Sequence, residues 1–356
     1  MPSPAVISDP AELSPEWMTA ALRSAGLDAE VTSVRSEPVG TGQMAHNERI
    51  FLEYAKGGSE AAPATLVGKF PSPNEESRAS GGRGAYRAET HFYTELANEL
   101  ACVTPQCLYG AIAPEGEAFT LLLEDLAPKQ QGDQILGASD DEIEAAVRNL
   151  AGLHAPRWGD PTLGDLDWVS VGIGEEYTAY IEMGTPIFLE RYKDRLRDED
   201  AATLAAFAAG VKNWVGRRPA TRTLVHGDYR LDNLMFESSA SGIRVAAVDW
   251  QTLSVACGGQ DLAYLLGNSS PPEQRRVHEE RMLDAYREEM SGLGVELTTR
   301  EVRSDYVYGT FQGPSITMLG SLAVGQTDRG DAMFMAMAER SCAQIRDLDA
   351  LALLDG

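Results

Sequence analysis

The sequence has few of the residues that build metal or disulfide frameworks. Its four cysteines are scattered without a Cys-x-x-Cys pair, which argues against a zinc site and a disulfide scaffold and fits the reducing cytoplasm. Long apolar runs are also missing, because no stretch approaches the roughly 20 residues that a membrane-spanning helix needs. The first residues lack the basic start and apolar core of a signal peptide. We therefore expect a cytoplasmic protein with no membrane partner.

Basic residues are scarce as well. The chain has 30 Lys and Arg against 54 Asp and Glu, for a net charge of −24. Nucleic-acid binding depends on neutralising phosphates with cations, so this balance predicts no nucleic-acid partner. An acidic surface that serves solubility is the favoured interpretation, and steering of a cationic substrate is the alternative. A length of 356 residues allows two lobes and a large core.

Two neighbouring segments carry the clearest chemistry, residues 223–236 (TLVHGDYRLDNLMF) and 245–251 (VAAVDWQ). Asp228 follows a short apolar strand and a sharp turn, Asn233 comes five residues later, and a second apolar strand ends at Asp249. Phosphoryl transfer from ATP uses such a set: one Asp accepts the hydroxyl proton, while the Asn and the other Asp hold Mg²⁺. A polar turn chosen only for its turn residues is the alternative, and the spacing is too specific for it.

The spacing H-x-D-x-x-x-x-N is that of a protein-kinase catalytic loop, with Gly227 where those enzymes have Arg. The run HGDYRLDN followed by a strand and Asp249 resembles the aminoglycoside phosphotransferase family. Within this family, HGDYRLDN resembles the branch that includes kinase domains fused to acyl-CoA dehydrogenases, whereas LEDL, DWQ and DLAYLL resemble the ecdysteroid-kinase-like branch. The resemblance covers roughly residues 35–290. It implies an α+β, bilobal protein-kinase-like fold, in which ATP lies between the lobes and a small-molecule hydroxyl is phosphorylated.

The same resemblance assigns supporting roles near this loop. Asp261, in the segment CGGQDLAY, is expected to orient the catalytic loop from behind, without direct chemistry. His226 is expected to hold the loop by hydrogen bonding and not to be the base. Trp250-Gln251 stands where protein kinases have Phe-Gly, and no A-P-E sequence follows. We therefore infer no activation-loop switch and no protein-kinase activity.

Three β-like segments are predicted near the N-terminus, at residues 30–38, 48–54 and 64–70, after a helix that starts at Ser14-Pro15. Gly40 and Gly42 lie between the first two segments, where the backbone is expected to fold over nucleotide phosphates. A lone G-x-G is weak evidence, because a plain hairpin turn has the same pattern.

Lys69 closes the third segment and is one of only five lysines in the chain. An edge lysine that reaches out to solvent is the bland alternative. The kinase resemblance implies instead that Lys69 contacts the α- and β-phosphates and is held by a Glu of the next helix. That helix is predicted over residues 85–100 from its apolar spacing. We take Glu89 as the partner, with Glu95 and Glu99 as weaker candidates.

A β-hairpin over residues 107–113 and 118–123 leads directly into LLLEDLAP. By resemblance this strand becomes the hinge that binds adenine. Leu123 is then expected to line the back of the pocket, while Glu124 and Leu126 present backbone groups to the base. The hinge divides the expected lobes into residues 1–126, which bind nucleotide, and residues 127–356, which carry the catalytic loop and the acceptor site.

The second lobe is predicted to be mainly helical. His154 ends the apolar face of a helix capped at Ser139, and we interpret it as a structural core residue. Four methionines near the C-terminus (Met318, Met333, Met335 and Met337) indicate helix core, with a pliable acceptor pocket as the alternative.

The overall prediction is an ATP- and Mg²⁺-dependent small-molecule kinase with Asp228 as the catalytic base. Two rivals remain open: a catalytically inactive nucleotide-binding module, and a metal-assisted phosphoesterase that uses Asp228. The acceptor and the oligomeric state are not readable from the sequence.

Overall fold

The computed structural model describes residues 4–40, 44–56, 61–75, 78, 83–171, 175–240 and 242–355. The chain divides into two compact units. The N-terminal unit comprises Met1–Glu99, Thr104–Ala127 and Asp249–Thr252, and the C-terminal unit comprises Leu100–Val103, Pro128–Val248 and Leu253–Gly356. A single boundary after residue 126 stays a prediction, because the two units exchange short segments: Leu100–Val103 belongs to the C-terminal unit and Asp249–Thr252 to the N-terminal unit. No helix in the described ranges is long and apolar enough to cross a membrane.

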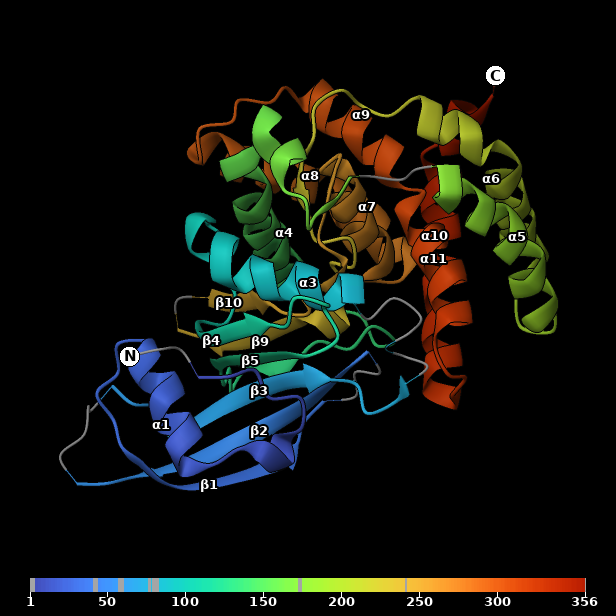
Figure 1. Cartoon of the computed structure of the whole chain (residues 1–356). Coiled ribbons are helices and arrows are strands. Elements are labelled where there is room, and N and C mark those ends of the chain that lie inside the picture. Colours follow the sequence, from blue (N-terminus) through green and yellow to red (C-terminus); the bar gives the residue numbers. More distant parts are fainter. Residues whose placement is uncertain are drawn as a thin grey trace. The chain divides into compact units, whose positions relative to one another are not determined.

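The N-terminal unit is built on an antiparallel sheet that, in the described residues, has five strands in the order β1-β2-β3-β5-β4 (Figure 1). The strands are β1 (Val31–Pro38), β2 (Ala45–Tyr54), β3 (Thr65–Pro71), β4 (Cys107–Ile112) and β5 (Phe119–Glu124). All three predicted N-terminal segments and the predicted hairpin are present in this sheet. Cross-strand pairing therefore places residues that are distant in sequence next to one another.

Helix α1 (Pro15–Ser24) covers one face of this sheet. The side chain of Ser14 accepts a hydrogen bond from the amide of Trp17, and Pro15 occupies the first turn, as the sequence predicts. Buried side chains of α1 pack with apolar residues of the strands, among them Ile50, Leu66 and Leu122. Side chains alternate between the two faces of a strand. With Leu66 on the α1 face of β3, Lys69 lies on the opposite face.

Helix α3 (Arg83–His91) carries Glu89 and continues as a π-helical turn, η3 (Phe92–Leu96), and a 3-10 turn, η4 (Ala97–Glu99). The segment predicted as a helix over residues 85–100 is helical through Glu99, but its second half is π and 3-10 helix and not α-helix. The wider π turn buries Phe92, Tyr93 and Leu96 together. The ring of Phe92 stacks on Trp250, with 3.8 Å between the ring centroids, so a long-range aromatic contact accompanies the change in helix geometry.

The C-terminal unit contains two small sheets, each with three strands in the described residues. Their orders are β10-β9-β6 and β7-β11-β8. The bounds are β6 (Gln130–Gln131), β7 (Ser170–Val171), β8 (Thr223–Val225), β9 (Leu234–Ser239), β10 (Gly242–Ala247) and β11 (Ser254–Ala256). The predicted catalytic loop connects β8 to β9 and includes a 3-10 turn, η7 (Leu231–Asn233). Strand β10 ends just before Asp249.

Helices make up most of the C-terminal unit. They are α4 (Asp140–His154), α5 (Glu175–Arg191), α6 (Asp198–Gly216), α7 (Gly259–Asn268), α8 (Pro272–Gly292), α9 (Thr299–Gly309), α10 (Gln312–Ala323) and α11 (Asp328–Asp347). Capping boxes begin α4 at Ser139 and α9 at Thr298. Helices α5, α6, α10 and α11 share one apolar core (Figure 1).

The structure also places the methionines and the surface charge. Met318 and Met337 are buried and Met333 and Met335 are half-buried, so the interpretation of these residues as helix core is confirmed for the first pair.

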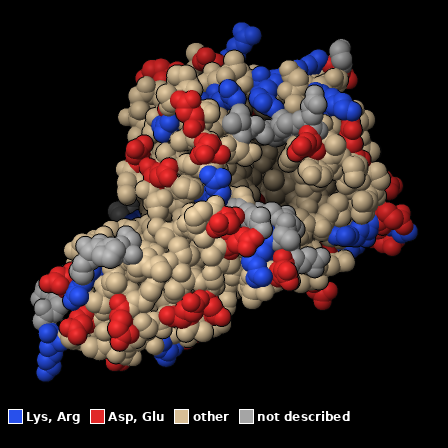
Figure 2. Space-filling model, viewed as in Figure 1, with Lys and Arg blue, Asp and Glu red and all other residues tan. Residues whose placement is uncertain are grey.

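On the face drawn in Figure 2, Asp and Glu side chains are spread widely and Lys and Arg side chains lie among them.

Candidate active site

In the N-terminal unit, Lys69 lies between two carboxylates. Its Nζ atom is 2.6 Å from Oε2 of Glu89 and 2.9 Å from Oδ1 of Asp249. The predicted ion pair between Lys69 and Glu89 is therefore confirmed. The interpretation of Lys69 as an exposed edge residue was wrong, because only 7% of it is exposed. Glu95, one of the weaker candidates, pairs with His91 instead.

Burial and charge act on Lys69 in opposite directions. Burial lowers the pKa of Lys69, but attraction to the Asp249 and Glu89 carboxylates outweighs it, and the pKa is raised. The side chain therefore stays cationic. A buried, permanently charged ammonium at a strand end is the kind of group that binds phosphate oxygens as a point charge.

Asp249 adopts an unusual backbone conformation. Its φ angle is +68°, in the left-handed region that residues other than glycine rarely occupy. The next residue, Trp250, donates its amide to Oε1 of Glu89 (3.2 Å) and its indole N–H to Thr104 (3.1 Å). These contacts, with the Phe92 stack, hold the strained turn. Glu89 thus binds both Lys69 and the backbone that follows Asp249.

Of the two predicted loop glycines, Gly40 is described and Gly42 lies outside the described residues. Gly40 has a φ angle of +79°, which a glycine adopts without strain. A Cβ atom added to Gly40 would lie 3.8 Å from the side-chain nitrogen of Asn47. Asn47 is in turn the cross-strand neighbour of Lys69 in the β2–β3 pairing. Gly40 therefore lies near the end of the sheet that carries Lys69.

The predicted hinge is held by a contact that the sequence did not reveal. Arg49 makes two hydrogen bonds to Asp125, of 2.9 and 3.3 Å, and Oδ1 of Asp125 also accepts the amide of Ala127 (3.1 Å). The amide of Glu124 is already donated to the carbonyl of Gln106 (2.8 Å).

Leu123 and Leu126 are buried in the same unit.

In the C-terminal unit, the carboxylate of Asp228 accepts hydrogen bonds from three side chains. Tyr264 donates its hydroxyl to Oδ1 (2.8 Å), and the side-chain nitrogen of Asn233 donates to Oδ2 (2.9 Å). Nε of Arg230 lies 3.1 and 3.2 Å from the two oxygens. The structure therefore brings Asp228 and Asn233 together as predicted, and it adds two donors that sequence reasoning missed.

His226 and Asp261 support the turn before Asp228. The buried carboxylate of Asp261 accepts the backbone amides of His226 (2.6 Å) and Gly227 (3.0 Å). The ring of His226 donates to the carbonyl of Val248 (3.0 Å) and accepts the amide of Asp228 (3.3 Å). Both side chains thus bind backbone groups of the loop, which is the geometry expected of supporting residues.

His154 extends this support from α4. The imidazole is fully buried, 2.7 Å from the hydroxyl of Tyr286 and 3.5 Å from Asp261. This position agrees with a structural role for His154.

Arg230 neutralises the acidic loop. Its Nη1 atom bonds Asp232 (2.8 Å) while its Nε atom bonds Asp228. Burial raises the pKa of Asp232, but attraction to Arg230 together with hydrogen bonds from the Gln134 amide, Arg329 and Arg230 outweighs it, and the pKa is lowered.

Gln134 binds the loop from a distant segment of the chain. Its backbone amide donates to the carboxylate of Asp232 (2.9 Å), and its side-chain oxygen accepts a bond from the backbone amide of Leu231 (2.9 Å). HGDYRLDN contains Arg230, but no local signal marks Gln134.

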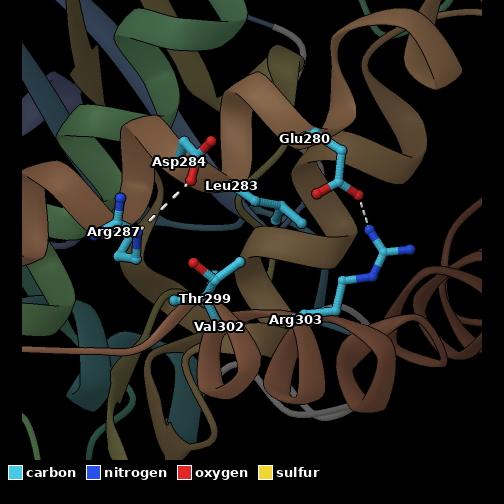
Figure 3. Close-up of a pocket in the computed structure, with 7 residues that line it drawn as sticks. All are labelled: Glu280, Leu283, Asp284, Arg287, Thr299, Val302 and Arg303. Atoms are coloured by element: carbon cyan, nitrogen blue, oxygen red, sulfur yellow. Dashed lines mark hydrogen bonds and ion pairs between the residues drawn. The ribbon is translucent and has the colours of Figure 1, made fainter.

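A small pocket elsewhere does not compete with this site. It lies between α8 and α9 (Figure 3), where Arg303 pairs with Glu280 and Arg287 lies 3.7 Å from Asp284. Its lining residues are Glu280, Leu283, Asp284, Arg287, Thr299, Val302 and Arg303. None of the predicted site residues lines it.

Comparison with known proteins decides the family. Residues 43–294, more than half of the chain, match the model of the phosphotransferase enzyme family. The chain belongs to this family. The resemblance found in the catalytic-loop sequence is thereby confirmed, and the protein is an enzyme that transfers a phosphoryl group. No curated protein matches the chain significantly in sequence.

Solved structures of phosphotransferases share the fold. A point mutant of aminoglycoside 2'-phosphotransferase-IIIa in complex with GDP aligns with a TM-score of 0.56 and 18% identity, over 89% of this chain and 94% of that one. Choline kinase from Streptococcus pneumoniae gives 0.51 and 15%, over 95% and 98%. Ethanolamine kinase from Plasmodium vivax gives 0.51 and 12%, over 89% and 83%. The predicted α+β kinase-like fold is confirmed.

The residues of this phosphotransferase fit a magnesium ion whose remaining ligands come from the nucleotide. Asn233 uses its side-chain nitrogen for bonds to the Asp228 carbonyl and carboxylate (both 2.9 Å), so neither bond uses its side-chain oxygen, an atom type that suits a cation. Among the described residues no group of three or more His, Cys, Asp or Glu side chains is arranged to hold a metal. Mg²⁺ is often held by one or two protein oxygens together with substrate phosphates and water, and this donor set matches that pattern.

Proposed function

We propose that this phosphotransferase moves the γ-phosphate of ATP, with Mg²⁺, to a hydroxyl of a small molecule. The observation that carries the proposal is Asp228, a carboxylate held by three donors in the loop that has the kinase spacing. Asp228 accepts the proton of the acceptor hydroxyl and orients that oxygen toward the phosphorus. Phosphoryl transfer has a loose transition state, so positioning and charge neutralisation account for most of the rate.

The N-terminal unit binds the nucleotide in this proposal. Lys69 contacts the α- and β-phosphates, and Glu89 keeps the ammonium in place. The backbone at Gly40 covers the phosphates, while the Glu124 carbonyl and Leu126 bind the base. The catalytically inactive module is disfavoured, because the Lys69–Glu89 pair and the Asp228–Asn233 pair are both assembled.

Asn233 and Asp249 hold the magnesium ion in this proposal. A bound Mg²⁺ would neutralise charge on the transferred phosphate. Both residues supply oxygen ligands, which Mg²⁺ prefers.

The similar structures point to acceptors for a first screen. They are an aminoglycoside phosphotransferase, a choline kinase and an ethanolamine kinase. Nucleotide consumption with Mg²⁺ is measured for ATP and GTP against these acceptors together with macrolides, sterols and hydroxyacyl-CoAs. We expect one class to give a phosphorylated product. Free phosphate without a phosphorylated acceptor would indicate the hydrolase instead.

The role of Asp228 is tested in the same assay. Asp228→Ala is expected to lower the rate by about 10²–10⁴-fold, as loss of a general base does, and Asp228→Asn tests the charge at constant shape. Asp232→Asn is the matched control, because Asp232 is in the same loop and also bonds Arg230, but bonds neither Tyr264 nor Asn233 through its carboxylate. A loss below tenfold in Asp228→Ala, or equal losses in the two asparagine variants, would contradict the assignment.

A further inference from the structure

Tyr264 is a buried phenol whose hydroxyl lies on the proposed base. It belongs to α7, has no exposed surface, and donates to Oδ1 of Asp228 over 2.8 Å. Asp261 lies three residues earlier on the same helix and accepts the two amides that precede Asp228. Residues three apart share one face of a helix. Helix α7 therefore contacts both the backbone and the carboxylate of the loop.

The three donors on Asp228 do not act alike. Nε of Arg230 is nearly equidistant from the two carboxylate oxygens, at 3.1 and 3.2 Å, so it does not distinguish them. Tyr264 bonds only Oδ1, and Asn233 bonds only Oδ2 and the Asp228 carbonyl. The terminal torsion of an Asp side chain is soft. The orientation of the carboxylate plane therefore depends on Tyr264 together with Asn233.

We propose that Tyr264 is a positioning residue for Asp228: it fixes the carboxylate orientation so that the same oxygen always meets the acceptor hydroxyl. This inference rests on the proposed role of Asp228 as base. Tyr264 acts through Asp228 and takes no part in the proton transfer itself.

The hydroxyl of Tyr264 serves this purpose and not packing alone. A phenylalanine would fill the same space without placing a polar group in the core, which requires a partner there. Burial and the nearby charge of Asp228 raise the pKa of Tyr264 well above its ordinary value, so the phenol stays protonated and remains a donor.

The test is Tyr264→Phe, which deletes one oxygen and preserves the ring. We expect kcat to fall about tenfold, since small misplacements of reacting groups have effects of this size or larger. The KM values for nucleotide and acceptor should stay within about twofold.

Tyr306→Phe is the matched control. Tyr306 is also buried on a helix, and its hydroxyl also donates to a carboxylate, Glu279, over 2.8 Å. Its kcat should stay within about twofold of the wild type. Because the Tyr306 hydroxyl also accepts a bond from Gln344 (2.7 Å), this variant should lose at least as much thermal stability as Tyr264→Phe.

A double-mutant cycle separates positioning from general damage. In the Asp228→Asn background, Tyr264→Phe should lower the residual rate by less than about twofold, because the group on which Tyr264 acts is already changed. An equal loss in both backgrounds, a kcat no lower than that of Tyr306→Phe, or an effect confined to KM would overturn the inference.

A structural measurement, which does not depend on turnover, tests the role of Tyr264 separately from the proposed function. Crystal structures of the wild type and Tyr264→Phe are compared at the Asp228 side chain. We expect a rotated carboxylate, or two orientations, in the variant, and a single unchanged orientation would overturn the inference. Absence of any Asp228-dependent turnover would instead refute the proposed function.

Discussion

Replacing Lys69 with methionine tests the charged cluster of the N-terminal unit. The substitution preserves the length of the side chain but leaves Glu89, which is 1% exposed, without its cation. Removing one partner of a buried ion pair costs about 3–5 kcal/mol. Asp249 adds little to this cost, because 41% of its side chain is exposed and water screens it. Glu89 also keeps its bond to the Trp250 amide, so we expect about 3 kcal/mol.

Lys69→Met/Glu89→Gln removes both charges and keeps an acceptor for the Trp250 amide. It should recover about 1–2 kcal/mol of the lost free energy of unfolding, although nucleotide binding stays lost. In the single variant, burial favours the neutral form of Glu89 and raises its pKa. A group whose pKa is raised in the folded state stabilises the protein at low pH, and this contribution to the free energy of unfolding is lost as the pH rises. Lys69→Met should therefore be more destabilised at pH 8 than at pH 5.

Urea unfolding at both pH values measures these effects. Lys212→Met is the control, because Lys212 is 71% exposed and pairs with Glu182, which is 40% exposed; it should cost less than about 1 kcal/mol. A loss below about 1 kcal/mol for Lys69→Met would refute the burial of the charge. Failure of the double variant to recover stability would show that charge is not the origin of the loss.

Two further predictions concern α7 and α9. Burial raises the pKa of Asp305 from 3.8 to about 6, so its contribution to stability is complete below about pH 4 and is lost as pH rises through 6. Asp305→Asn should therefore raise the melting temperature at pH 7.5 more than at pH 5, and an equal shift at both pH values would contradict the assignment. Gly259→Ala should destabilise the protein by several kcal/mol, about what overpacking costs, because a Cβ atom there meets the backbone carbonyl of Asp305. Gly216→Ala, whose Cβ meets nothing within 4 Å, should leave the melting temperature within about one degree of the wild type or above it.

The parts of the site that the sequence predicted are local. Asp228 and Asn233 lie five residues apart in one loop, so their proximity follows from a strand, a turn and a short helix. Ser14 and Ser139 cap helices through bonds to residues three positions later. The ion pair of Lys69 and Glu89 was predictable because the strand end and the next helix recur in the kinase plan.

The remaining features depend on contacts between distant residues. Asp249 reaches Lys69 across 180 positions of sequence, and its left-handed backbone has no signal in DWQ. Helix periodicity predicted an apolar stripe beside Glu89, but not the π turn that stacks Phe92 on Trp250.

The supports of the hinge and of the base arise in the same way. Arg49 bonds Asp125, which is 76 positions away in the sequence, and Tyr264 bonds Asp228, which is 36 positions away. The sequence by itself determined which groups we propose for the chemistry, since the types and the spacing of Asp228 and Asn233 are local. Only the tertiary structure decided which side chains hold them, because such a partner is selected by the packing of whole helices and strands.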